Sequence, residues 1–139
     1  MLDGLTHEQQ MLQESTRRFV DEEMLPYEDL VDRDGHVPIE LGRQIESRAK
    51  EIGLFAANLP ENVGGGGLDY TCMAVIEREF GRTSHALHAW VARPTELLLA
   101  TEGAQKEQYL APCVTGAKRE LFALSEPEAG SDIMSMKSN

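Results

Sequence analysis

The first half of the chain alternates apolar and polar positions with the period of an amphipathic helix. A capping-box pattern at Thr6 and Gln9 opens one such stretch, and Pro26 ends it because a proline ring does not fit inside a helix. A second apolar stripe follows Pro38, a residue favoured at the first helical position, and closes at Gly53. The pattern predicts helices over residues 6–25 and 38–52, joined by an acidic turn at residues 32–36.

Three further helices are predicted beyond the middle of the chain. Asp69 is a good N-cap for a helix that stops before Gly81. The stretch from Ser84 to Ala100 is apolar nearly all round, which is typical of a buried helix, and Pro94 kinks or restarts it. A last helix runs from residue 105 to about residue 115, where Gly116 stops it.

After residue 119 the pattern changes from helical to extended. Residues 120–125 are typical of a strand, and the proline and glycine of residues 126–132 do not continue it. A single strand leaves its backbone hydrogen-bonding groups unpaired. We therefore expect an all-α, five-helix domain at residues 1–118 and the beginning of a β domain at residues 119–139, in a chain that is the N-terminal part of a longer protein.

The net charge of the chain excludes some classes of binding partner. Its 139 residues include 24 acidic and 13 basic side chains, so the formal net charge is −11, which repels nucleic acids and anionic membranes. A hydrophobic content of 41% is that of a globular protein and not of a disordered one. The start of the chain resembles neither a signal peptide nor a transit peptide, so we expect a cytoplasmic protein without nucleic-acid or membrane partners.

Few residues in the helical region are candidates for catalysis or for binding a metal or a phosphate. Cys72 and Cys113 are far apart in the sequence and are interpreted as buried thiols of a reducing compartment. His85 and His88 share a helical face but have no third metal ligand at matching spacing, so no metal site is predicted. Four consecutive glycines at residues 64–67 match neither phosphate-binding glycine motif and indicate a flexible turn between helices.

The segment from Phe122 to Asp132 combines several features of a ligand-binding loop. Its strand offers backbone N–H groups and the Ser125 hydroxyl, Gly130 allows a ligand to approach the backbone, and Ser131 adds a second hydroxyl. Such a loop can bind a planar, anionic cofactor without a cation. Taken alone, the segment has the alternative interpretation of a plain exit from a strand.

Several motifs, in order along the chain, resemble the acyl-CoA dehydrogenase family. Residues 53–61, followed by Gly-Gly-Gly-Leu-Asp-Tyr, are similar to the connection between its second and third helices. Residues 105–112 and Gly116 resemble its fifth helix. The run Phe-Ala-Leu-Ser-Glu-Pro-Glu-Ala-Gly-Ser-Asp at residues 122–132 resembles its flavin-binding strand and loop. The opening Leu-Thr-His-Glu-Gln and the turn at residues 32–35 also fit this family.

The resemblance implies FAD as cofactor and acyl-CoA as substrate. By comparison with the family, Ser125 lies near the pyrimidine edge of the flavin, and Phe122 and Leu124 match neighbours that shape the flavin site. Gly130 and Ser131 belong to the loop that contacts FAD, and Ser131 also bounds the acyl-CoA site. Ser125 stands where threonine is commoner and keeps the hydroxyl that stabilises the reduced flavin.

The reaction of the family involves residues beyond this chain. Family members remove an α proton from an acyl thioester with a glutamate base and pass a hydride from the β carbon to flavin N5. The base lies in a C-terminal helical domain, so no catalytic residue is predicted here, and the chain alone is expected to be inactive. Electron-transfer flavoprotein is the implied electron acceptor, and a homo-oligomer, dimer or tetramer, is the implied assembly.

Two alternatives remain open from the sequence. His88, Ala92 and Thr95 are predicted to line the acyl pocket if the segment 84–100 forms one of its walls, whereas in the alternative the whole segment is bundle core. The bulky Trp90 and Arg93 complicate both interpretations. The alternatives to a dehydrogenase are a helical interaction module without catalysis and a family oxidase or monooxygenase.

Overall fold

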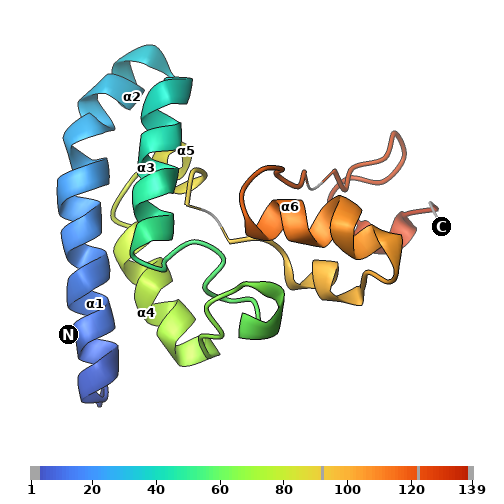
Figure 1. Ribbon diagram of the computed structural model, residues 1–139. Coiled ribbons are helices and arrows are strands. Elements are labelled where there is room, and N and C mark those ends of the chain that lie inside the picture. Colours follow the sequence, from blue (N-terminus) through green and yellow to red (C-terminus); the bar gives the residue numbers. More distant parts are fainter. Residues whose placement is uncertain (1–3, 92, 122, 138–139) are drawn as a thin grey trace.

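The computed structural model describes residues 4–91, 93–121 and 123–137, and these residues are mostly helical (Figure 1). The α-helices are α1 (His7–Phe19), α2 (Glu28–Asp34), α3 (Ile39–Glu51), α4 (Tyr70–Phe80), α5 (His85–His88) and α6 (Ala111–Val114). Helices α1, α3 and α4 lie side by side, and α6 lies in a second helical part at the right of Figure 1. The predicted all-α class is confirmed. None of the helices among the described residues has the length and apolar character needed to cross a bilayer.

Short π-helical and 3-10 turns lie between these helices and after α6. Two are π-helical (Val20–Met24 and Lys106–Leu110), and four are 3-10 turns (Leu25–Tyr27, Glu61–Val63, Glu96–Ala100 and Ile133–Ser135) in the described chain. The first predicted helix therefore does not end at Pro26, because the chain passes through two such turns into α2. A proline is tolerated at the start of a helical turn, where its missing N–H is not needed. Asp32 and Asp34, predicted in a turn, are helical, and Gly35 ends α2 with a φ of 71°.

The main hydrophobic core lies between α1, α3 and α4. Phe19 on α1 meets Phe80 on α4 edge to face, with 6.3 Å between the ring centres. Ile45 and Ala49 bring the apolar stripe of α3 to the same core, and Leu87 attaches α5 to it. Burying such side chains is the main source of stability in a helical domain. The core therefore holds α5 against the three longer helices.

A buried carboxylate joins α1 to α4. Glu79 on α4 has a side chain that is 1% exposed, and it accepts hydrogen bonds from Arg17 Nε and Nη2 at 3.0 and 2.9 Å. Gln13 Nε2 donates to it at 3.0 Å, and Arg82 Nη1 lies 3.4 Å away. The Arg17 guanidinium holds the pKa of Glu79 below its usual value. The buried charge is therefore paired by two side chains of α1 and by Arg82, which follows the end of α4.

Helix α4 begins and ends where the sequence predicts. The Asp69 carboxylate accepts the backbone N–H of Cys72 at 2.7 Å, which lowers the pKa of Asp69, and Gly81 follows the last helical residue. The last predicted helix also forms, as the π-helical turn Lys106–Leu110 continuing into α6. Gly116 follows it with a left-handed φ of 74°.

The segment 84–100 is not the continuous buried helix that its apolar composition predicts. Helix α5 ends at His88, and helical structure resumes only in the turn Glu96–Ala100. Pro94 is the cause, because it has no N–H to continue the helix and its ring crowds the preceding turn. Leu97 and Leu99 are 73% and 39% exposed, so the second half of the segment is not bundle core.

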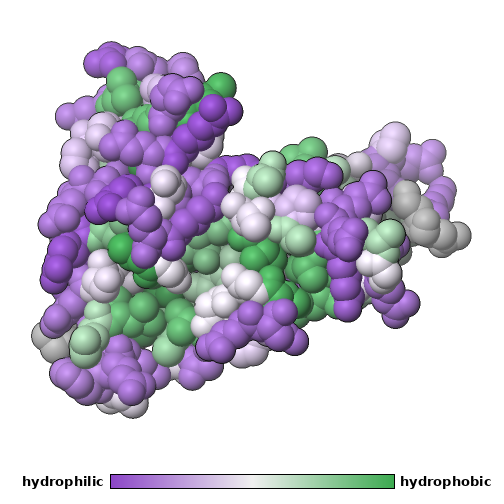
Figure 2. All heavy atoms as spheres, viewed as in Figure 1, coloured by the Kyte–Doolittle hydropathy of each residue, from purple (hydrophilic) through white to green (hydrophobic). Residues whose placement is uncertain are grey.

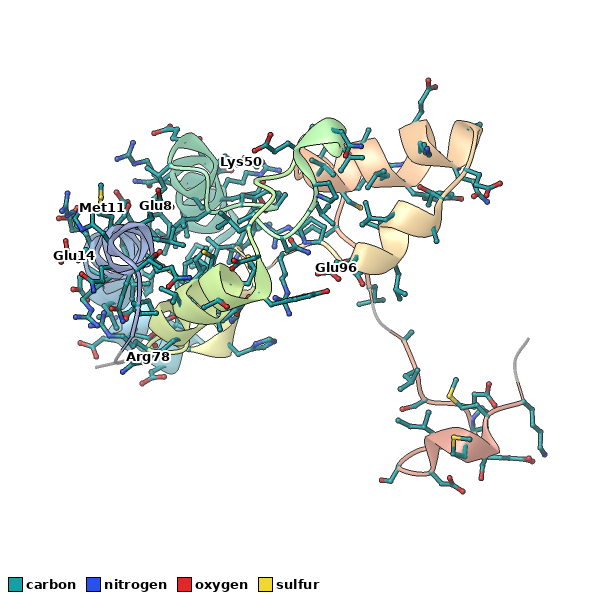
Figure 3. All side chains as sticks on the ribbon, turned by 90° about the horizontal axis from the view of Figure 1, so that it is seen from below. Glu8, Met11, Glu14, Lys50, Arg78 and Glu96 are labelled. Carbon is teal, nitrogen blue, oxygen red and sulfur yellow. The ribbon has the colours of Figure 1, made fainter. Side chains whose placement is uncertain are left out.

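The predicted strand at residues 120–125 is not formed in the part of it that the structure describes. Residues 123–137 overlap α6 in Figure 1, but Figure 3 shows that they stand away from the helices. A strand is stable only beside a partner strand, and the described chain supplies an isolated bridge between Glu126 and Ala129 instead. Their reciprocal backbone hydrogen bonds of 2.9 and 3.2 Å close a turn at Pro127.

Candidate functional site

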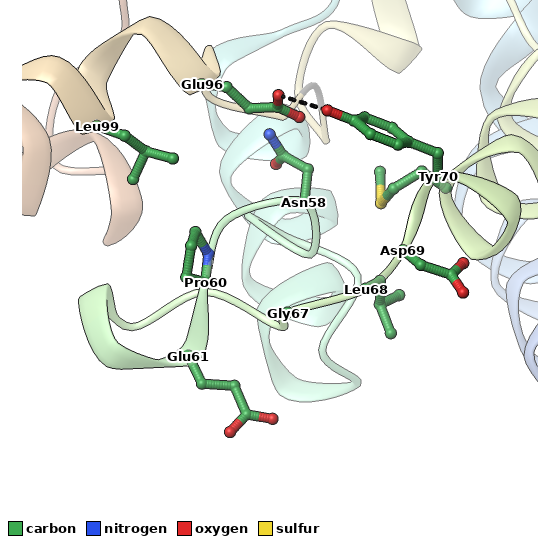
Figure 4. A pocket seen from close by; sticks show the side chains of 10 residues that line it. Asn58, Pro60, Glu61, Gly67, Leu68, Asp69, Tyr70, Glu96 and Leu99 are labelled. Carbon is green, nitrogen blue, oxygen red and sulfur yellow. Dashed lines mark hydrogen bonds between the residues drawn. The ribbon is translucent and has the colours of Figure 1, made fainter.

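Clefts surround the extended chain between α5 and the turn Glu96–Ala100. Figure 2 shows hydrophobic side chains gathered on the face between the upright helices and the helices at the right, with a hydrophilic rim. One cleft of about 570 Å³, named the Leu68 cleft, opens beside α4 (Figure 4). In it the Tyr70 hydroxyl donates to Glu96 Oε2 at 3.2 Å. Asn58 Nδ2 donates to the Pro94 carbonyl at 2.9 Å, so polar contacts hold the extended chain against α4 and its preceding loop.

Two further clefts adjoin the same segment of the described chain. A cleft of about 590 Å³, the Thr95 cleft, includes Tyr70 and Glu96 among its lining residues. A cleft of about 560 Å³, the Phe55 cleft, is largely apolar but receives cationic side chains. Its lining residues are Phe55, His85, Ala89, Arg93, Pro94, Cys113, Lys118, Arg119, Glu120 and Leu121. Pro94 lines two of these three clefts, so the surface around it is hollowed and mixes apolar with charged side chains.

His88 is held by an acidic partner and an aromatic ring. Its Nε2 lies 3.3 Å from Glu77 Oε2, a contact that lowers the pKa of Glu77. The imidazole also packs on Phe80, with 5.4 Å between the ring centres. The His85 ring is 6.4 Å away and nearly perpendicular. Among the described residues, no group of three or more His, Cys, Asp or Glu side chains is placed to hold a metal ion.

The residues predicted to line the acyl pocket do not share one helical face. Thr95 lines the Thr95 cleft, and its backbone N–H donates to the Glu120 carboxylate. His88 lies before the break in the helix and Thr95 after it, so the helical spacing on which the prediction rests is wrong. Ala92 lies outside the described residues. Their role toward a substrate stays a prediction.

The residues predicted to contact the flavin lie on the segment that stands away from the helices. Leu124 is half-buried, whereas Ser125, Gly130 and Ser131 are exposed. No hydrogen bond within the described chain engages either serine hydroxyl, and a Cβ added at Gly130 would meet no atom within 4 Å. Phe122 lies outside the described residues. The segment thus presents free donors but is not brought against His88 or Thr95.

The four glycines form a tightly packed turn between helices. Their amides donate to backbone carbonyls of Glu61, Pro60, Ala56 and Leu59. A Cβ at Gly65 would overlap the Leu59 carbonyl, so glycine is required there for close approach. The turn between helices is confirmed, and hydrogen bonds and close backbone contacts hold it. Because all four amides are engaged, none is available to hold a phosphate.

The cysteine thiols are free, Cys113 buried and Cys72 half-buried. Cys113 lines the Phe55 cleft, and burial raises the pKa of its thiol. Burial likewise raises the pKa of the Cys72 thiol. Both groups therefore remain protonated near neutral pH and are poor nucleophiles.

Sequence reasoning missed a cluster formed by Arg119, Glu46 and Trp90. Arg119 donates to the Glu46 carboxylate, and its guanidinium carbon lies 4.3 Å from the centre of the Trp90 ring. The signal that points to this cluster is Gly42, a glycine inside a predicted helix. A Cβ at Gly42 would fall within the indole of Trp90, and a glycine inside a helix indicates such a close approach.

The described fold matches a known family and known structures. The model of the acyl-CoA dehydrogenase N-terminal domain matches residues 6–117. Glutaryl-CoA dehydrogenase of Desulfococcus multivorans is 33% identical over 144 residues, covering 97% of this chain and 36% of that protein. The CarC subunit of the caffeyl-CoA reductase–Etf complex of Acetobacterium woodii is 32% identical over 133 residues, covering 91% and 34%.

A solved structure extends the comparison to three dimensions. The crystal structure of an acyl-CoA dehydrogenase complexed with FAD from Bacillus anthracis is similar with a TM-score of 0.79 and 28% sequence identity. The similarity covers 99% of this chain and 24% of that one. The chain spans about a third of the length of the two curated relatives, 34% and 36%. By its sequence over residues 6–117 and by its helical fold, the chain belongs to the acyl-CoA dehydrogenase N-terminal domain family.

Proposed function

We propose that this chain is the N-terminal helical part of a flavin-dependent acyl-CoA dehydrogenase. The observation that carries the proposal is the family match over residues 6–117, supported by the similarity to a dehydrogenase complexed with FAD. Residues 1–118 then form the helical domain and residues 119–139 begin the β domain. The reaction is removal of an α proton and a β hydride from an acyl-CoA thioester, with the base supplied from outside this chain.

The exposed loop has donors and an open backbone position that suit a flavin. FAD, when bound, supplies the hydride acceptor of the reaction. Ser125 and Ser131 have hydroxyls that no residue of the described chain engages, and Gly130 has an open surface where a ligand can approach the backbone. Ser125 would donate to the edge of the flavin ring where negative charge collects on reduction, and Ser131 would donate to the phosphate side of FAD. Phe122 and Leu124 shape the flavin site.

The acyl group lies against the hollowed surface around Pro94. Thr95 lines a cleft there, and we place His88, Ala92 and Thr95 near the acyl group together with Ser131. These residues bind and orient the thioester. None of them is assigned a proton-transfer step.

Electron-transfer flavoprotein is the proposed electron acceptor. The relative from Acetobacterium woodii is a subunit of a complex with Etf, which supports this choice. The assembly is proposed to be a homo-oligomer, and its location cytoplasmic.

The test is the flavin content and acceptor use of the intact protein that carries this sequence, purified from the cells that make it. We expect one FAD per chain and acyl-CoA oxidation coupled to electron-transfer flavoprotein. A colourless protein contradicts the proposal and favours a helical interaction module. Production of hydrogen peroxide or a hydroxylated product, with no transfer to electron-transfer flavoprotein, identifies an oxidase or a monooxygenase instead.

A further inference from the structure

Arg119 connects parts of the chain that are distant in sequence. It lies between α6 and the segment that carries the proposed flavin contacts. Its Nη1 donates to the Ala89 carbonyl at 2.8 Å, and its Nη2 donates to the carboxylate of Glu46 on α3. Its guanidinium stacks over Trp90 at 4.3 Å, close enough for a cation–π interaction. We name these contacts the Arg119 anchor.

The carbonyls within reach of Arg119 are those of Ala89 and Trp90, which follow the end of α5. In a continued helix, the Ala89 carbonyl would accept from Arg93 and the Trp90 carbonyl from residue 94. Residue 94 is a proline and has no N–H. Arg119 Nη1 donates to the Ala89 carbonyl, and its Nη2 lies 3.4 Å from the Trp90 carbonyl. The helix break and the arginine therefore complement each other.

Helix α3 is shaped to receive this anchor. Glu46 is only 8% exposed, and besides Arg119 it accepts a hydrogen bond from Lys50. Gly42 lies one turn earlier, and a Cβ there would fall within the Trp90 indole. The missing side chain thus lets the indole lie flat on α3, where Arg119 stacks on it. A buried carboxylate and a glycine on one helix face together fix the position of the guanidinium.

The anchor limits where the proposed flavin contacts can lie. Ser125 is six residues beyond Arg119, and an extended chain covers at most about 20 Å over that length. The adjacent Glu120 accepts a hydrogen bond from the Thr95 amide and ties the chain at a second point. Residues 123–137 then leave the helical body (Figure 3). Residues 119 and 120 are therefore the last point at which these contacts attach the chain to the helical body before residues 123–137.

We propose that Arg119 is a positioning residue for the flavin-contacting loop. It fastens the chain to α3 and to Trp90 just before that loop, so that Ser125 and Ser131 reach the cofactor from a fixed starting point. Fixing a loop before binding raises affinity, because less conformational freedom is lost on binding. The inference rests on the proposed function, since it takes the loop to contact FAD.

Fluorescence tests the anchor in the 139-residue chain, where Trp90 is the only tryptophan. Arg119→Met keeps a long side chain but removes the charge and the donors, and Arg119→Lys keeps the charge without the planar group. Lys106→Met removes an exposed cation that lines none of the three clefts and is the matched control. We expect a changed Trp90 emission in Arg119→Met, a smaller change in Arg119→Lys, and the wild-type spectrum in Lys106→Met. A wild-type spectrum in Arg119→Met overturns the anchor.

FAD affinity of the intact protein tests the positioning role. We expect about tenfold weaker binding for Arg119→Met, an intermediate loss for Arg119→Lys, and wild-type affinity for Lys106→Met. Measurement at a temperature where circular dichroism shows every variant folded separates this effect from lost stability. Wild-type affinity in folded Arg119→Met overturns the inference.

A second variant covers a folding failure. If Arg119→Met does not fold, Glu46→Gln weakens the same anchor from α3, and the same loss of FAD affinity is expected; unchanged affinity again overturns the inference. A wild-type protein without FAD contradicts the proposed function itself, and the positioning role falls with it. The fluorescence result would still decide whether the anchor exists.

Discussion

Replacing Glu79 with glutamine tests the buried ion pair that joins α1 to α4. The side chain of Glu79 is 1% exposed and receives both Arg17 nitrogens at 2.9 and 3.0 Å. Glutamine has the same size but carries an N–H₂ group where one carboxylate oxygen accepts, so one donor faces another donor. Loss of a hydrogen bond to a buried charged group costs about 2 kcal/mol.

A loss of this size corresponds to a fall in melting temperature of roughly 6–10 °C for a domain of this length. The matched control is Glu40→Gln, because Glu40 forms an exposed ion pair with Arg43 at 3.7 Å. Exposed pairs contribute between 0 and about 1 kcal/mol, so the control should melt close to the wild-type chain. Circular dichroism at pH 7 measures both variants.

The pH dependence gives the second half of this test. The pKa of Glu79 is lowered in the folded chain from an ordinary value of 4.5, chiefly by the Arg17 hydrogen bond. The stabilisation is therefore complete above that value and is lost as the pH falls through the folded pKa. The difference between wild type and Glu79→Gln should shrink as the pH falls below about 4.5. A difference equal to that of the control, or one that stays constant with pH, refutes the reasoning.

Three other outcomes follow from the glycine turn and the exposed loop. Gly65→Ala should destabilise the chain by about 2 kcal/mol or more in thermal melting, because the added methyl overlaps backbone, while Gly130→Ala should melt like wild type. Ser131→Ala in the intact protein should weaken FAD or acyl-CoA binding by about 1 kcal/mol in a titration, whereas Ser125→Thr keeps the hydroxyl and should bind as wild type. The 139-residue chain alone should retain little FAD on gel filtration, and stoichiometric retention would show that it holds the whole site.

Residues that begin or end a helix through contacts with the adjacent backbone were predicted well from the sequence. Asp69 and Gly81 bracket α4 because a carboxylate satisfies free amides at the start and a glycine ends the helix at no steric cost. Pro26 was predicted to end the helical region, but it lies in the first turn of a 3-10 helix, where its missing N–H is not needed. Here a π-helical turn absorbs the change and α2 continues the chain.

Non-local contacts account for what the sequence did not predict. The apolar composition of residues 84–100 resembles a core helix, but Leu97 is 73% exposed, so composition alone does not decide burial. The Arg119 anchor joins residues 73 positions apart, Arg119 and Glu46, and no local pattern indicates such a pair. Gly42, a glycine inside a helix, was the sequence signal that pointed to the close packing of Trp90 on α3. The loop from Leu124 to Ser131 was found through its resemblance to a family motif, and its contacts stay predictions.

The most direct test of the proposed function is an anaerobic titration of the intact protein with a series of acyl-CoA thioesters, followed by visible absorbance. If the chain is part of a flavin-dependent acyl-CoA dehydrogenase, at least one thioester bleaches the flavin band as hydride reaches the cofactor, and electron-transfer flavoprotein restores the band. A protein that carries FAD but is bleached by no thioester, or one that carries no flavin, would contradict the account.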